Sequence, residues 1–221
     1  MPEDHRMPIN MPKSIDDAVS PEFPEVQMNL VTPKDPVTGI VVKSEVCLKG
    51  GRKSASFVRH VEIDISGTPL EGQCVAGQSF GVMAPGENEK GKPHKVRLYS
   101  LASPTLGEDG EGKVISTTPK RVIDEYTPQK EGDDEERHDL FLGVCSNYVC
   151  DLKVGDKVQV TGPSGKRFLL PSDHNKHDYI FMATGTGIAP FRAMCKDLFD
   201  NPTGPTTSQV HLVMGTPYTT D

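Results

Sequence analysis

The chain has 221 residues, a length between one ordinary domain and two full ones. Its composition is that of a globular protein, and the high numbers of Gly (21) and Pro (19) favour turns and strands over long helices. The net charge of -7 argues against general nucleic-acid binding, which needs a basic surface.

The cysteines predict neither a disulfide scaffold nor a metal centre. There are five of them, an odd number with no Cys-x-x-Cys spacing: Cys47, Cys74, Cys145, Cys150 and Cys195. We therefore expect reduced thiols and no metal site. The first twenty residues lack the apolar core of a signal peptide and are too acidic for a typical transit peptide, and no apolar run is long enough to span a membrane. These features predict a cytoplasmic protein.

Residues 1–36 are rich in proline and are predicted to form an extended or disordered N-terminal arm. Seven of the 19 prolines lie in this segment, at positions 2, 8, 12, 21, 24, 33 and 36. Proline lacks an amide donor and interrupts regular hydrogen-bond ladders.

Residues 37–172 are predicted to form an antiparallel β-domain. Apolar and polar residues alternate along Phe57–Ile65, as in a half-buried strand. Gly and Pro separate this strand from further short candidates, a pattern typical of a barrel or sandwich. Those candidates are Val37–Val46, Gln78–Met83, Val96–Leu101, Gly112–Thr117 and Lys157–Thr161. The charged stretch 131–139 is predicted to be a solvated hairpin loop.

Residues 177–221 are predicted to begin an α/β domain. An apolar strand from Tyr179 leads through a Gly-rich turn into a helix near Pro190, and a second apolar strand covers Gln209–Gly215. Strand, helix and strand form one βαβ unit, the opening of a parallel sheet. One such unit cannot cover both faces of that sheet.

Three short segments carry residues suited to a phosphate-containing cofactor. In the first, Arg97–Ser100, strand geometry places Arg97 and Tyr99 on one face, where a cation could meet phosphate and a ring could stack. An edge strand with ordinary surface residues is the alternative.

The second segment, Gly143–Leu152, suggests a helix N-terminus. Ser146 or Asn147 could cap a helix over Tyr148–Leu152 and leave its amides available to an anion, although a plain capped helix explains the same residues.

The third segment, Gly185–Pro190, resembles a phosphate loop but fits neither common pattern. It lacks the Gly-Lys-Ser/Thr ending of nucleotide hydrolases. Pro190 also stands where the standard dinucleotide motif has its third Gly.

Together and in this order, Arg97–Ser100, Gly143–Ser146 and Gly185–Arg192 resemble the signature blocks of the plant and cyanobacterial type ferredoxin–NADP⁺ reductase family. The similarity extends between the blocks and covers roughly residues 55–217. It implies a Greek-key antiparallel β-barrel that binds FAD, followed by an α/β Rossmann-like domain that binds NADP(H).

The resemblance also implies roles for individual residues. Arg97 would contact the FAD pyrophosphate, Tyr99 would stack on the isoalloxazine, and Ser100 would be the catalytic residue near flavin N5. Further cofactor-binding residues would be Leu98, Thr118, Lys120, Gly143, Val144, Cys145, Ser146, Thr186, Gly187, Thr216 and Pro217. Pro119 departs from the family pattern beside Lys120.

The implied activity is electron transfer between NADP(H) and a small acidic one-electron carrier such as ferredoxin or flavodoxin. Lys92, His94 and Lys95 could steer such a partner, although a solvated turn explains them equally well. The family residues that select NADP and assist hydride transfer would follow Asp221, so we expect a truncated reductase. Two alternatives stay open: a flavin-binding module without hydride transfer, and the reductase component of an oxygenase system.

Overall fold

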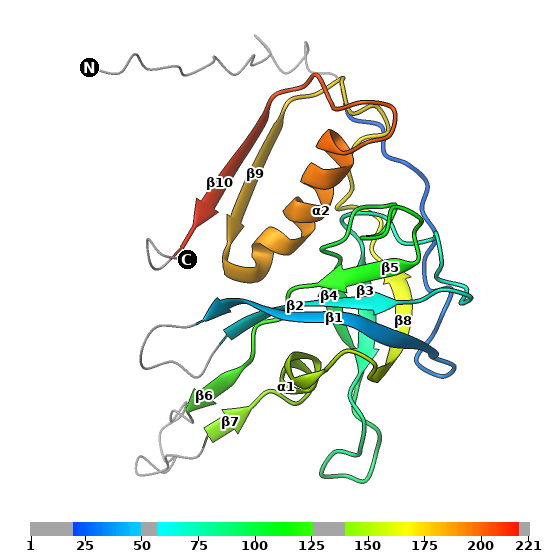
Figure 1. The fold of residues 1–221 in the computed structure, drawn as a ribbon, viewed down its shortest axis with the longest axis vertical. Helices are drawn as coiled ribbons and strands as arrows, with labels where there is room; N and C mark the ends of the chain where they lie inside the picture. Colours follow the sequence, from blue (N-terminus) through cyan, green and yellow to red (C-terminus); the bar gives the residue numbers. More distant parts are fainter. Residues whose placement is uncertain (1–19, 50–56, 126–139, 217–221) are drawn as a thin grey trace.

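A computed structural model describes residues 20–49, 57–125 and 140–216 (Figure 1). The predicted acidic loop 131–139 and the predicted cofactor residue Pro217 lie outside these ranges. None of the helices in the described ranges has the length and apolar character needed to cross a bilayer.

The larger unit is a six-stranded antiparallel sheet that curls into a barrel-like shape. Its strands follow the order β4-β3-β8-β1-β2-β5 and have these bounds: β1 Val37–Lys49, β2 Phe57–Asp64, β3 Ser79–Met83, β4 Arg97–Ser100, β5 Val114–Thr117 and β8 Lys157–Ser164. The edges approach each other, because the Ala102 amide donates to the Ser116 carbonyl (2.8 Å) and the Thr117 hydroxyl donates to the Ser100 carbonyl (2.9 Å). The predicted antiparallel barrel is therefore confirmed.

The core of this unit follows from the alternation seen in the sequence. Val61 and Ile63 of β2 are fully buried, as are Phe80 and Val82 of β3. Val149 of helix α1 (Val144–Asp151) belongs to the same hydrophobic cluster, so the helix is fixed to the barrel by its apolar side.

Helix α1 begins earlier than predicted. It starts at Val144 with Gly143 as its N-cap and without any side-chain cap, so the predicted helix is present but its predicted start at Tyr148 and its cap by Ser146 or Asn147 are wrong. Ser146 and Asn147 lie in the first turn instead, where both side chains donate to the Gly143 carbonyl (3.2 and 2.7 Å). A short antiparallel pair precedes the helix, β6 (Ile123–Glu125) with β7 (Leu140–Leu142).

The predicted βαβ unit is confirmed. Strand β9 (Tyr179–Thr184) leads through a 3₁₀ turn, η2 (Gly185–Gly187), into α2 (Ile188–Phe199), and β10 (Val210–Gly215) returns parallel to β9. Pro190 is the third helical residue rather than the first. It still lies in the first turn, where amides have no partner within the helix, so its missing N–H costs nothing.

Helix α2 lies between the β9–β10 pair and the barrel (Figure 1). Phe181 of β9 and Leu198 of α2 are buried in a second hydrophobic cluster that includes Ala76 and Leu170 from the larger unit. On the opposite face of the pair Met182 is 71% exposed, so α2 covers one face of this sheet.

The described part of the N-terminal arm, residues 20–36, contains no helix and makes a turn at Thr32–Asp35. The Gln78 side chain donates to the Gln27 carbonyl (3.0 Å), and the Ser172 amide donates to the Glu22 carbonyl (2.8 Å). The predicted domain limits at residues 36 and 172 stay predictions.

Candidate functional site

The first motif is the edge strand β4. Its register with β3 places Tyr99 opposite Phe80 and Arg97 opposite Val82. Arg97 and Tyr99 thus follow one face of the strand, and Leu98 lies on the other face, 59% exposed. Arg97 and Ser100 are exposed, while Tyr99 is half-buried against the core. An exposed cation beside a fixed ring on an open edge can contact a planar, negatively charged ligand.

The second motif lies against the first. Tyr99 packs against the core cluster that contains Cys145, and the Cys145 thiol donates to the Val82 carbonyl (3.7 Å). Burial, together with the neighbouring Cys145 thiol, raises the pKa of Tyr99 well above its ordinary value. Burial also raises the pKa of the Cys145 thiol, although the neighbouring Tyr99 hydroxyl and the Arg97 charge oppose that shift. Both groups are therefore protonated near neutral pH, and Cys145 is not a nucleophile here.

The start of α1 is closely packed at Gly143. A Cβ added there would lie 2.5 Å from the Ser146 hydroxyl oxygen and 2.9 Å from the Val122 Cβ. The first turn carries no acidic residue and no side-chain cap. Helix N-terminal amides of this kind bind anions.

We expect Gly143→Ala to lower the free energy of unfolding by about 1–3 kcal/mol, because the new methyl group overlaps Ser146 and Val122. Gly187→Ala is the matched control, since a Cβ there would meet nothing within 4 Å and the backbone φ is −61°. Urea denaturation of both variants measures the difference. Equal stability of the two would contradict the close packing at Gly143.

Thr118 and Lys120 lie beside β5. The Thr118 hydroxyl oxygen is buried and has no hydrogen-bond partner in the described residues. A buried polar atom of this kind costs free energy unless a ligand or water satisfies it. Lys120 is exposed and its backbone forms an isolated bridge with Val58.

The third motif is the η2 turn at the N-terminus of α2. Gly185 has φ +52°, a conformation that favours glycine, and Gly187 is exposed with open space around it. Thr186 is half-buried between them. Thr216, which follows β10, is exposed. The turn thus offers open backbone at a helix N-terminus, as a phosphate site requires.

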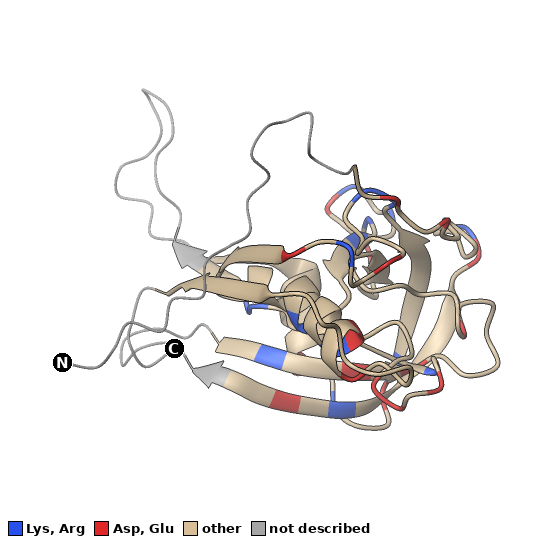
Figure 2. Ribbon diagram, turned by 90° about the horizontal axis from the view of Figure 1, so that it is seen from above, with Lys and Arg blue, Asp and Glu red and all other residues tan. Residues whose placement is uncertain are grey.

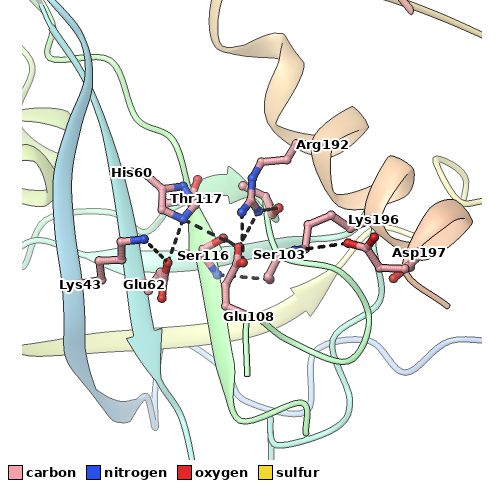
Figure 3. Close-up of polar contacts among 12 residues, drawn as sticks. Lys43, His60, Glu62, Ser103, Glu108, Ser116, Thr117, Arg192, Lys196 and Asp197 are labelled. Carbon is pink, nitrogen blue, oxygen red and sulfur yellow. Dashed lines mark hydrogen bonds and ion pairs between the residues drawn. The ribbon is translucent and has the colours of Figure 1, made fainter. Parts of the chain in front are cut away.

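A charged network that was not predicted joins the third motif to the barrel (Figure 3). Arg192 of α2 donates to Glu108 through both terminal nitrogens (2.5 and 3.1 Å) and also to the Ala102 carbonyl (2.5 Å). The His60 Nε2 atom lies 3.7 Å from Glu108 and 3.3 Å from Glu62, and Lys43 lies 3.3 Å from Glu62. Two cations and two carboxylates therefore surround a buried histidine.

Burial and the Arg192 charge lower the pKa of His60 below 6.5, although Glu108 and Glu62 oppose them. Burial raises the pKa of Glu108, but hydrogen bonds from Arg192 and Ser116 outweigh it and hold the pKa below 4.5. His60 is thus neutral and Glu108 ionised near neutral pH.

We expect the free energy of unfolding of the protein to fall as the pH falls, because of the groups in this network. The unfolded chain protonates His60 near pH 6.5 while the folded chain resists, so the free energy of unfolding falls below that pH until His60 is protonated in the folded state too. The Glu108 contribution is present above about pH 4.5 and is lost at lower pH. Urea midpoints of His60→Gln should therefore change less between about pH 7.5 and 5.5 than those of the wild type. Parallel pH profiles would contradict the assignment.

The predicted partner cluster lies in the β3–β4 connection. Lys92 and Lys95 are exposed and His94 is half-buried, but Glu87 and Glu89 belong to the same loop. Acidic and basic residues are interspersed along the loops of the molecule rather than gathered on one face (Figure 2). Steering by this cluster stays a prediction.

A cavity of about 570 Å³ lies elsewhere, between the loop around Thr105 and the C-terminal half of α2. None of the predicted cofactor residues lines it. The candidate cofactor site is instead the open surface formed by β4, the start of α1 and the η2 turn.

Comparison of the sequence with known proteins finds ferredoxin–NADP reductases. No protein-family model matches the chain. Ferredoxin–NADP reductase root isozyme 1 of Arabidopsis thaliana, a protein named as chloroplastic, is 42% identical over 177 residues, which are 79% of this chain and 44% of that protein. The ferredoxin–NADP reductase of Synechocystis is 39% identical over 175 residues, 79% of this chain and 39% of that protein. The chain spans about half the length of the curated relatives it matches.

Comparison with solved structures also finds ferredoxin–NADP⁺ reductases. A mutant ferredoxin–NADP⁺ reductase from Plasmodium falciparum in complex with 2′P-AMP superposes with a TM-score of 0.62 at 26% identity, over 87% of this chain and 65% of that one. The antiparallel barrel followed by a parallel α/β unit is therefore a reductase-type, two-part fold. Over most of its length the chain is a homologue of the plant and cyanobacterial ferredoxin–NADP reductases, so the resemblance drawn from the three motifs is confirmed.

Proposed function

We propose that this chain binds FAD on its barrel and takes part in electron transfer between NADP(H) and a small one-electron carrier of the ferredoxin type. The observation that carries the proposal is the packing of Tyr99, from the first motif, against the core cluster that contains Cys145, from the second, which brings the two motifs into one surface. When bound, FAD supplies the hydride and single-electron chemistry, and the protein supplies binding and orientation.

The residues present fit FAD. Arg97 offers an exposed guanidinium for the pyrophosphate, and Tyr99 offers a ring held against the core. The uncapped first turn of α1 offers backbone amides from Val144, Cys145 and Ser146. The Thr118 hydroxyl is buried and unpaired among the described residues, as expected of a group that a ligand completes. Leu98 and Lys120 are exposed at the edges of this surface. Ser100, at the end of β4, would assist the hydride step.

The residues of the η2 turn fit a nicotinamide nucleotide. Thr186 and Gly187 precede α2, whose N-terminus favours phosphate, and Thr216 with Pro217 would continue the same site. The named complex of the Plasmodium reductase with 2′P-AMP supports NADP(H) rather than NAD(H) as the family's nucleotide.

For the electron carrier we propose ferredoxin, after which the relatives are named, with an acidic flavodoxin as a second candidate. Lys92, His94 and Lys95 would attract such a partner, and its association rate should then fall as salt increases. A cytoplasmic location belongs to the same proposal.

One experiment separates the proposal from its alternatives. Purified protein is reconstituted with FAD, mixed anaerobically with NADPH and then, in separate reactions, with oxidised ferredoxin or oxidised flavodoxin. Bleaching of the flavin absorbance by NADPH and its return with ferredoxin support the proposal. Bound flavin that NADPH does not bleach would favour a flavin-binding module without hydride transfer. Bleaching that ferredoxin and flavodoxin do not reverse would favour the reductase component of an oxygenase system.

A further inference from the structure

We propose that Arg192 is a positioning residue that sets the distance between the η2 turn and strand β4, an inference that rests on the proposed function. These two elements carry the nucleotide and flavin residues, and they belong to different units of the fold. The sequence blocks that contain them include Arg192 but leave it without a role.

The contacts of Arg192 connect the two blocks directly. Arg192 lies in the second turn of α2, and its side chain reaches the Ala102 carbonyl (2.5 Å). Ala102 is two residues beyond Ser100, in the segment that continues β4. One side chain therefore links the helix that follows η2 to the chain that follows the proposed flavin strand (Figure 3).

Glu108 fixes the orientation of the guanidinium. Its two carboxylate oxygens accept from the two terminal nitrogens of Arg192, a geometry that a lysine cannot reproduce. The Glu108 side chain is 9% exposed and also accepts from the Ser116 hydroxyl (2.7 Å). Since Ser116 belongs to β5, the barrel holds the Glu108 carboxylate in place. A fixed acceptor of this kind can determine the position of α2 relative to the barrel.

A second contact joins α2 to the barrel, but at a different place. Asp197 accepts from the Thr105 amide (2.8 Å) and hydroxyl (2.6 Å). Asp197 lies in the C-terminal half of the helix, farther along the chain from η2 than Arg192 is. Loss of the Thr105 hydroxyl should therefore weaken the attachment of the helix without releasing its N-terminal end. This contact provides a control for general loosening.

The rate of hydride transfer is sensitive to small changes in the distance between the reacting groups. A displacement of about 1 Å between reacting groups can lower the rate about a hundred-fold. If Arg192 positions η2, its loss should slow hydride transfer while the flavin, held mainly by Arg97 and Tyr99, stays bound.

The test compares Arg192→Met, Arg192→Lys and Thr105→Val in the whole flavin-loaded protein. Stopped-flow reduction by NADPH gives the limiting rate and the apparent Kd for NADPH, and visible circular dichroism reports the surroundings of the flavin. We expect Arg192→Met to bind FAD within about threefold of wild type and to lower the limiting rate roughly 10- to 100-fold. Arg192→Lys should recover part of that rate, and Thr105→Val should change it less than about twofold. Glu108→Gln, which keeps the shape of the side chain, replaces Arg192→Met if that variant does not fold, and an intermediate loss is expected.

The outcomes are distinguishable. A wild-type protein that binds no FAD, or is not reduced by NADPH, would overturn the proposed function and the role of Arg192 with it. A wild-type protein that is reduced, with an unchanged limiting rate in Arg192→Met, would overturn the role of Arg192 alone. So would an equal loss of rate in Thr105→Val, which would show general loosening rather than positioning.

Discussion

Replacing Arg97 with Ala is expected to weaken FAD binding about 10- to 100-fold while leaving the fold intact. A hydrogen bond to a charged group contributes about 1.5–3 kcal/mol, and each 1.4 kcal/mol is about a factor of ten in affinity. Arg97 is exposed at the first residue of β4, so its loss removes little packing. Quenching of flavin fluorescence during titration measures the Kd.

Lys90→Ala is the matched control for this experiment. Lys90 is an exposed cation in the loop that precedes β4, and it belongs to neither the flavin surface nor the partner cluster. Its loss should leave the Kd for FAD unchanged within about twofold. A similar weakening in both variants would mean that general positive charge, rather than Arg97, attracts the cofactor.

Phe80→Ala is expected to lower the free energy of unfolding by about 3–5 kcal/mol, which approaches the whole stability of many domains. Phe80 is fully buried in the barrel core. It also lies opposite Tyr99 in the β3–β4 pair, so the cavity would remove the support of the proposed flavin ring contact. Equilibrium denaturation in urea measures the loss.

The control for this substitution is Phe141→Ala. Phe141 of β7 is 61% exposed and should cost less than about 1 kcal/mol. A small effect of Phe80→Ala, comparable to that of Phe141→Ala, would contradict the core as described.

The sequence predicted those parts of the fold whose pattern is local. Alternation along Phe57–Ile65 and the strand–turn–helix order from Tyr179 onward both correspond to observed elements, because burial on one face imposes a period on the sequence. The strands β6 and β7 have three residues each, too few for such a period to appear. The start of α1 was predicted too late in the sequence. Ser146 and Asn147 have side chains suited to an N-cap, but both lie in the first turn of the helix and donate to the Gly143 carbonyl.

The candidate site was predicted in its parts but not in its connections. The residue types of the three motifs pointed to Arg97, Tyr99, Cys145 and Thr186. The packing of Tyr99 against the cluster that contains Cys145 depends on tertiary structure, which no local pattern records. Glu108 and Arg192 are 84 positions apart, beyond any local pattern. The sequence contained one partial indication of the charged network. His60 and Glu62 are two residues apart on strand β2, and therefore lie on the same face of it. Arg192 is a charged residue within the third signature block, but the resemblance implies no role for it.

The proposed function requires the barrel surface formed by β4 and α1 to bind flavin. Titration of the purified wild-type protein with FAD at micromolar concentration, followed by absorbance and fluorescence after removal of free cofactor, tests this claim. We predict one FAD bound per chain, with a shifted visible spectrum and weakened binding in Arg97→Ala. Recovery of colourless protein that leaves all the FAD in the unbound fraction would contradict it.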